Sequence, residues 1–411
     1  MRKINKKMTV FVFAVIFLIT GICNKGFFDS VAKSAKKLND DDNGISLKTV
    51  RQFCDEMETN TQEKLVYHNE LMDINSLKEN ISGTRIITKD DSVIVRSDNG
   101  SLIAASPRIM DESSLDEIAD HVKGFEECAQ GAGAKFLYCA VPTKTFYETY
   151  PENVTDNSVL NYRNYIQKLK DRQIPLLDLG DVFKEKNMSE DSLYFYTDHH
   201  WTSRTAFEAS GAICERLNLN YGFSYDEKAA DINNYKIKTY KNTSLGSYGK
   251  KVGTWFTWRG KDDFDLIIPE FSTDLTERSL RTKKIVRSGS FENTVLHTEQ
   301  IKDDPYKSVM YDIYSNGNQN MQIVLNNLKE DGKTVLIIRD SFGSPVTPFL
   351  SLHTGQLHIL DIRPDDRLNP KTYIRKIKPD YVIILYTGIT SYEEGGKFDF
   401  DSGKTEWTKL L

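Results

Sequence analysis

Short apolar runs alternate with longer segments of helical periodicity along most of this chain, and this alternation limits its fold more than any other feature. The run KTVLIIR at 333–339 is the strongest strand signal in the region beyond the N-terminus. The predicted strands are 135–141, 174–179, 333–339, 357–362 and 380–386. The predicted helices are 115–131, 160–173 and 201–217. Because strands separated by helices form βαβ units, we expect an α/β fold in which helices flank a parallel sheet.

Two regions depart from this alternation. The segments 92–96 and 101–105 flank an Asp-Asn-Gly turn at 98–100, which predicts a β-hairpin. Residues 220–305 are rich in Lys, Asp, Thr and aromatic residues, and we interpret them as an insertion of strands and loops within the domain.

The charge balance and the cysteines exclude two classes of protein. The chain has 54 Lys and Arg against 59 Asp and Glu, a net charge of -5, whereas a nucleic-acid protein needs a basic face. Its five cysteines show neither a Cys-x-x-Cys metal spacing nor tight pairing, so we expect free thiols.

The N-terminus predicts a membrane anchor. Basic residues in 1–7 precede the uncharged run 8–23, and no Ala-x-Ala cleavage site follows, so we expect 1–23 to be an uncleaved signal anchor. The positive-inside rule then places everything after it outside the cell membrane. We expect a polar stalk at 24–64 and a globular domain at 65–411.

Ser341 is the first candidate for chemistry. It follows the predicted strand 333–339 through Asp340, and Gly343 lies two residues further on. Ligands of parallel α/β sheets bind at the carboxyl ends of strands, where the backbone N–H groups after Ser341 could hold an oxyanion. The alternative is an ordinary turn, in which Asp and Ser are frequent.

The segment Thr197-Asp198-His199-His200-Trp201 is the second candidate. In an extended chain, side chains two residues apart share a face, so we expect Asp198 and His200 to point one way and His199 the other. A carboxylate beside an imidazole fixes its tautomer, and such an imidazole can activate a serine. Two alternatives remain: a helix cap with packed histidines, and an Asp-His-His metal site.

Together these segments resemble the DHHW protein family of Gram-positive bacteria, which is similar to the SGNH-hydrolase-like proteins of alginate O-acetylation. The Asp-His-His-Trp and Asp-Ser-Phe-Gly blocks carry most of the resemblance, which covers roughly 135–386. Weaker matches in the same order are Val-Pro-x-Lys at 141–144, Gly-Asn at 317–318 and Asp-x-Arg at 361–363. One Gly precedes Asn318, where the family often has two.

The resemblance implies an SGNH-hydrolase-like fold and assigns roles to residues. Ser341 would be the nucleophile, His200 the base and Asp198 the residue that orients it. Asn318, Lys144 and Trp201 would be candidates for contacting the substrate or the oxyanion, although Lys144 could instead orient a loop. We expect neither a metal nor another cofactor.

The expected function is that of an exported serine acyltransferase or esterase, which adds acyl groups to a cell-envelope polysaccharide or removes them, with acetyl as the expected acyl group. The resemblance implies a membrane acyl-exporting protein as a partner, because no acyl donor is made outside the cell. One alternative is a metal-dependent phosphoesterase of the Asp-His-His type, but the other strand ends lack repeated metal motifs. Another is a non-catalytic glycan-binding or scaffold protein, since fold does not imply function.

Two tryptophans in the insertion are candidates for contacting sugars. Trp255 and Trp258 could stack on sugar rings if they are exposed, because an aromatic face offers an apolar platform. Burial in the core is the alternative and the one that we favour from the sequence.

The expected topology can be tested directly. Protease added to intact protoplasts should degrade the globular domain, because an anchor at 8–23 leaves it outside. Full protection of the domain in intact protoplasts, with degradation after lysis, would contradict this topology.

Overall fold

The structure is a computed structural model that describes residues 68–89, 92–317, 321–363, 368–387 and 397–403. The chain divides into two compact units, 1–78 and 79–411. The predicted anchor and the predicted stalk lie outside the described residues, which include only 68–78 of the first unit. Among the helices of the described ranges, none is both long and apolar enough to cross a membrane.

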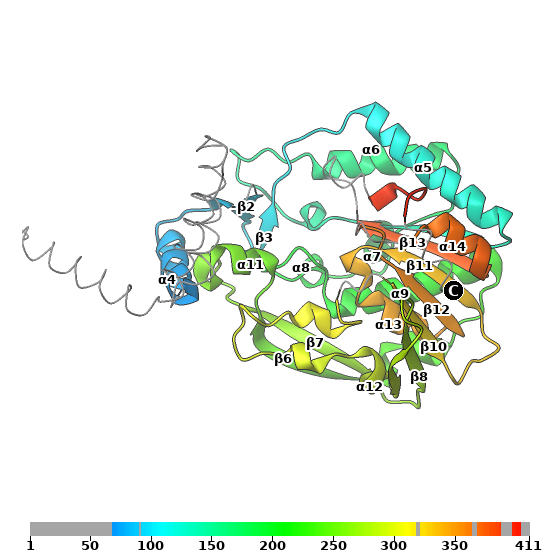
Figure 1. Ribbon diagram of the computed structural model, residues 1–411. Coiled ribbons are helices and arrows are strands. Elements are labelled where there is room, and N and C mark those ends of the chain that lie inside the picture. The colour runs from blue at the N-terminus through cyan, green and yellow to red at the C-terminus, as the bar shows by residue number, and fades with distance from the viewer. Residues whose placement is uncertain (1–67, 90–91, 318–320, 364–367, 388–396, 404–411) are drawn as a thin grey trace, which may run out of the picture. The chain divides into compact units, whose positions relative to one another are not determined.

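A mixed sheet forms the centre of the second unit (Figure 1). Its described strands run in the order β5-β4-β13-β11-β12-β10-β8-β9. Their bounds are β4 Lys135–Val141, β5 Leu176–Asp178, β8 Leu275–Ser279, β9 Ile285–Gly289, β10 Met321–Asn326, β11 Thr334–Arg339, β12 Gln356–Leu360 and β13 Tyr381–Thr387. The five strands that the sequence predicted are confirmed.

The expectation of an all-parallel sheet is only partly right. Strands β5, β4, β13, β11 and β12 pair in parallel, whereas β10 pairs antiparallel with both β12 and β8, and β8 with β9. Strands β8 and β9 come from the region 220–305, which therefore extends the central sheet as well as supplying loops. These strands are hard to recognise because β9 is largely exposed and lacks an apolar run.

Helices cover both faces of this sheet (Figure 1). Alternate residues of β4 face opposite sides: Leu137 packs with α9 and α13, and Phe136 with α5, α6 and α14. Burial on both faces explains why the central strands are continuously apolar. The described helices are α4 His68–Ile81, α5 Glu112–Gly131, α6 Ser158–Asp171, α7 Leu179–Glu185, α8 Glu190–Leu193, α9 Ser203–Tyr221, α10 Glu227–Ala230, α11 Ser247–Val252, α12 Phe291–Val295, α13 Val346–Ser351 and α14 Pro370–Ile377. The 3-10 turns are η1 Lys144–Tyr147, η2 Ile232–Asn234, η3 Thr254–Phe256, η4 Thr298–Gln300, η5 Met310–Ile313 and η6 Ser341–Gly343.

Two smaller sheets accompany the central one. Strands β1 Ile86–Lys89, β2 Ser92–Arg96 and β3 Leu102–Ala104 are antiparallel, which confirms the predicted hairpin. Strands β6 Tyr235–Ser244 and β7 Asp262–Pro269 pair within the region 220–305. The domain boundaries inferred from the sequence stay a prediction.

A glycine closes the β2–β3 hairpin. Gly100 has a φ of +88°, which favours a residue without a side chain, and a Cβ there would lie 2.8 Å from the Trp258 ring. Elsewhere, Cys128, Cys139 and Cys214 are free thiols, as expected, while the other two cysteines lie outside the described residues.

The parallel strands bring the ends of distant segments to one edge of the sheet. Strands β4, β11 and β13 are neighbours and run in the same direction, so Pro142, Asp340 and Thr387 emerge together. The loop 195–200 is closed by an antiparallel bridge between Tyr194 and Trp201.

Candidate active site

Ser341 begins the η6 turn directly after β11. The preceding Asp340 is buried, and its carboxylate accepts hydrogen bonds from the Thr387 backbone N–H and hydroxyl, each at 2.8 Å. Burial raises the pKa of Asp340, but Lys397 and the bonds from Thr387 outweigh it, so the pKa lies below its usual range. A charged Asp340 therefore ties the Ser341 turn to the end of β13.

The N–H groups after Ser341 do not form the open oxyanion site that the sequence suggested. Phe342 N–H donates to the Asp340 carboxylate at 3.0 Å, and Gly343 N–H donates to the Asp340 carbonyl at 3.1 Å. Ser344 N–H donates to the Ser341 carbonyl at 3.1 Å. That expectation was wrong because the turn uses these donors to close on itself.

Ser341, His200 and Asp198 form a hydrogen-bonded chain, although they come from segments 141 residues apart. The Nε2 atom of His200 lies 2.9 Å from Ser341 Oγ, and its Nδ1 atom lies 2.9 Å from Asp198 Oδ1. The side chains of His200 and Asp198 are only 12% and 13% exposed. In this arrangement the Asp198 carboxylate can orient the His200 imidazole, and the imidazole can accept the proton of the Ser341 hydroxyl.

The electrostatics assign a tautomer to His200. Burial lowers the pKa of His200, and His199 lowers it further, against an opposing contribution from Asp198. Burial would raise the pKa of Asp198, but His200 and His199 hold it well below its usual range. Near neutral pH, Asp198 is therefore a carboxylate that accepts the Nδ1 proton of a neutral His200, whose Nε2 lone pair faces Ser341.

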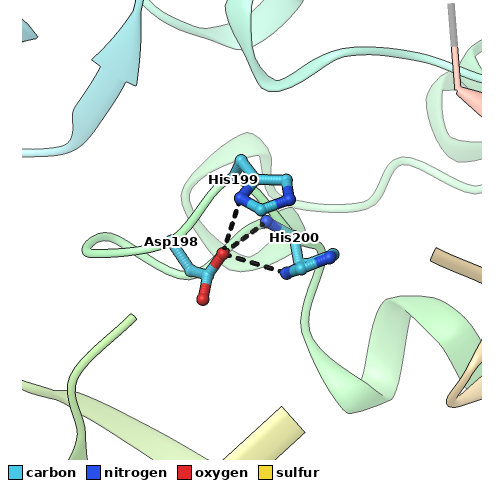
Figure 2. Close-up of side chains that lie close together, drawn as sticks. All are labelled: Asp198, His199 and His200. Carbon is cyan, nitrogen blue, oxygen red and sulfur yellow. Dashed lines mark hydrogen bonds and ion pairs between the residues drawn. The ribbon is translucent and has the colours of Figure 1, made fainter. Parts of the chain in front are cut away.

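His199 does not point away, contrary to the prediction. Figure 2 shows both imidazole rings turned toward the same Asp198 oxygen. The Nδ1 atom of His199 lies 3.0 Å from Asp198 Oδ1 and 2.8 Å from Ser247 Oγ. The prediction assumed an extended segment, whereas the chain bends through 196–200, so the alternation of a strand does not apply.

The His200 ring lies between two other rings. The centroid of His199 is 3.8 Å from that of His200, with planes 36° apart, and Tyr311 of η5 stacks at 4.0 Å and 17°. Tyr311 also donates a long hydrogen bond of 3.5 Å to the Phe342 carbonyl. Tyr311 was not predicted as a site residue, because nothing in its local pattern places it beside a histidine 111 residues earlier.

Lys144 holds the loop that carries Asp198. Its buried Nζ donates to the backbone carbonyls of Leu102, Phe195, Tyr196 and Asp198 at 2.6–3.1 Å. Burial lowers the pKa of Lys144 to about 8. Because its donors are all directed at the backbone, Lys144 orients the loop and is not placed to contact a substrate.

Two further supports of the loop were missed. Asp262 of β7 accepts hydrogen bonds from the N–H groups of Tyr196 and Thr197 at 2.5 and 2.9 Å, and from the Thr197 hydroxyl. Ser247, the first residue of α11, donates its N–H to Asp198 Oδ2 at 3.0 Å. A Cβ on Gly246 would lie 2.4 Å from Asp198 Cβ, so only glycine allows this approach. Both supports come from the region 220–305, where the sequence shows no motif.

The remaining candidates are placed as follows. Trp201 is fully buried, and its indole N–H donates to the Phe342 carbonyl at 3.0 Å, so it supports the Ser341 turn and does not face a substrate. Asn318 lies outside the described residues. The Asp-x-Arg match lies beneath Ser341: Asp361 is 3.6 Å from the buried Arg339 and 2.5 Å from Arg363.

Asp198, His199 and His200 also offer one ligand atom each within 4.8 Å of one another, which is the alternative metal site. Both nitrogens of His200 are engaged, however, one by Asp198 and one by Ser341. A metal bound through either nitrogen would break one of these contacts. The arrangement therefore fits a hydrogen-bonded triad better than a metal centre.

Trp255 and Trp258 are 49% and 56% exposed, so the prediction of core burial was wrong. The guanidinium of Arg96 lies 5.3 Å from the centre of the Trp258 ring. Nearby, Arg259 lies 4.1 Å from the Tyr196 ring, two residues before Asp198. Both tryptophans are therefore partly exposed at the surface.

Residues 104–245 match the family described as the SGNH hydrolase-like domain of the acetyltransferase AlgX. The resemblance inferred from the sequence is thereby confirmed. PatB1 of Bacillus cereus, solved with a sulfonyl adduct, is 18% identical with a TM-score of 0.61 over 77% of this chain and 99% of PatB1. A DHHW family protein from Eubacterium siraeum is 20% identical with a TM-score of 0.57 over 77% of this chain and 98% of that protein. These likenesses show a shared fold. No curated protein matches the chain.

The protonation of His200 is the first test of this site. We expect the pKa of His200, measured by NMR with 13C-labelled histidine, to lie below 6.5, because burial disfavours the imidazolium. Asp198→Asn should lower it further by removing the attractive charge, and His199→Phe should raise it. Titration of His200 above 6.5 in the unaltered chain would contradict this electrostatic assignment.

Proposed function

We propose that this protein is an exported serine acyltransferase or esterase, which adds acyl groups to a cell-envelope polysaccharide or removes them, with acetyl as the preferred group. The observation that carries the proposal is the contact of 2.9 Å between His200 Nε2 and Ser341 Oγ, with Asp198 on the other nitrogen. The match of 104–245 to a domain of an acetyltransferase supports acetyl as the acyl group.

The first half of the reaction forms an acyl-serine. Ser341 Oγ attacks the carbonyl carbon of the acyl donor while its proton passes to His200 Nε2. Asp198 stabilises the resulting imidazolium through Nδ1. The tetrahedral intermediate then collapses, its bond to the leaving group breaks, and His200 returns the proton to that group.

The second half transfers the acyl group onward. A sugar hydroxyl or a water molecule attacks the acyl-serine, and His200 takes its proton and returns it to Ser341 Oγ. A sugar gives transfer and water gives hydrolysis, so one site serves both reactions. Since the N–H groups after Ser341 are used within the turn, we assign Asn318 as a candidate oxyanion donor, as the resemblance implies.

The proposed location follows from the N-terminal sequence. A single anchor at 8–23 would hold the domain on the outer face of the cell membrane. An acyl donor made inside the cell would then have to reach Ser341 through a membrane acyl-exporting protein, which is the proposed partner.

Variants of the triad test the mechanism. Ser341→Ala and His200→Ala should each lower kcat for hydrolysis of p-nitrophenyl acetate about a thousandfold or more, because members of one catalytic unit act together. Asp198→Ala should lower kcat less, by a factor roughly tenfold smaller or more, since the carboxylate does not itself accept the proton.

Two controls separate this mechanism from the alternatives. A serine-directed reagent should inactivate the enzyme and a chelator should not. Wild-type rates in Ser341→Ala would eliminate the serine mechanism, and loss of activity to the chelator would favour the metal site at Asp198, His199 and His200. Insensitivity to both reagents, with no turnover, would favour a scaffold.

The stacking of His199 and Tyr311 on His200 predicts smaller losses of activity. His199→Ala should lower kcat about two- to tenfold, the equivalent of the roughly 0.5–1.5 kcal/mol that an aromatic pair contributes. His199→Phe keeps a ring and should retain most of kcat, as should Tyr311→Phe. If His199→Phe lost as much as His199→Ala, the contacts of Nδ1 and not the stacking would be what matters.

A further inference from the structure

A cavity lies at the same edge of the sheet as Ser341, and neither Ser341 nor His200 lines it. Its volume is about 780 Å³, which lies in the range of small-molecule sites. It opens where β4 and β5 end, at Pro142 and Asp178, and its walls come from η1, α6, α7 and α8. The proposed reaction assigns it no role.

The floor of this cavity is aromatic. Phe146 and Tyr162 pack edge to face at 4.8 Å, and the half-buried Tyr147 lies next to Phe146. Burial raises the pKa of the Tyr147 phenol, and the nearby carboxylates of Asp178 and Glu190 raise it further, so the phenol stays protonated and can donate a hydrogen bond. An aromatic face with a polar edge is a surface on which a sugar ring can stack.

A carboxylate stands beside these rings. Asp178 Oδ1 accepts hydrogen bonds from the Tyr162 hydroxyl at 2.8 Å and from Gly180 N–H at 3.0 Å. Both of these hydrogen bonds go to Oδ1, and no donor among the described residues bonds to Oδ2 of Asp178. Asp178 also lines the cavity. A carboxylate oxygen held in this way is an acceptor for a ligand hydroxyl.

The rim of the cavity carries both positively and negatively charged side chains. Lys170 and Lys184 line the cavity together with Asp181 and Glu190, and none of these four forms an ion pair within the described part of the chain. A strongly charged ligand would meet like charge on one side of the rim, and an acyl tail would leave the Asp178 carboxylate without a partner. A neutral ring rich in hydroxyl groups fits both the floor and the rim.

The cavity shares a wall with the catalytic loop. Tyr147 belongs to the same η1 turn as Lys144, whose Nζ binds the carbonyl of Asp198. The Tyr147 ring lies 5.7 Å from that of Tyr194, the residue whose backbone bridges Trp201 across the loop. One strand, β13, separates β4 from β11, so the ends of these two strands lie about 10 Å apart, taking about 4.8 Å per strand.

We propose that this cavity binds a neutral sugar unit of the acceptor glycan, stacked on Tyr147 and hydrogen-bonded to Asp178, while a neighbouring unit of the polymer reaches Ser341. This inference rests on the proposed function, because it treats the ligand as the acceptor of the acyl group.

Direct binding to neutral oligosaccharides tests the proposal. The full chain carrying Ser341→Ala is titrated calorimetrically with cellotetraose and with chitotetraose, so that turnover does not complicate the measurement. We expect at least one of them to bind. Asp178→Asn should weaken that binding about tenfold, because it removes the charge of the acceptor while Asn keeps the contacts to Tyr162 and Gly180. Tyr147→Leu should weaken it similarly by removing the ring.

Asp111→Asn is the matched control, because Asp111 also caps a helix, α5, through its side chain but lies outside the cavity. Asp111→Asn in the Ser341→Ala chain should bind the oligosaccharide as tightly as the Ser341→Ala chain alone. All of the variants should have the same melting temperature as the Ser341→Ala chain. Absence of binding to both oligosaccharides, or equal affinity in the parent, Asp178→Asn and Tyr147→Leu, would overturn the sugar site. Failure of the proposed function would show differently, as equal ester hydrolysis by the wild type and Ser341→Ala.

Discussion

The buried ammonium group of Lys144 is the interaction on which the geometry of the site depends. It donates to backbone carbonyls of the β2–β3 hairpin and of the loop 195–200, and so joins these two segments. Separating them would leave either a buried charge or buried carbonyls without partners, and both cost free energy. Asp198 and His200 therefore lie in a loop that has little freedom to rearrange, with His200 facing Ser341.

Buried ionic groups also support the turn that carries Ser341. Arg339 is fully buried beneath the Ser341 turn, where its guanidinium donates to the Gly317 carbonyl at 3.0 Å and faces Asp361. Asp340 connects the same turn to β13. A buried charge is stable only while its partners stay in place, because it has lost its contacts with water. The position of Ser341 is therefore set by several groups that do not contact a substrate.

Much of the parallel core was predictable, because a strand buried on both faces must be apolar throughout, as in 135–141 and 333–339. The antiparallel edge was not, because an exposed strand such as β9 needs no apolar run and its pairing is decided by neighbours far along the chain. The triad residues were named from their chemistry and a family resemblance. The orientation of His199 was not predictable, since a two-residue alternation holds only where the chain is extended.

The sequence by itself determined which groups were available: a serine after a buried strand, two histidines beside a carboxylate, and a lysine after β4. Only the tertiary structure decided how they are used. It directs Lys144 and Trp201 to backbone carbonyls and stacks Tyr311 on His200. It also gathers an aromatic cavity beside Asp178. These outcomes depend on contacts between residues up to 141 positions apart, and local periodicity carries no information about which distant groups will satisfy a buried charge or fill the space beside a ring.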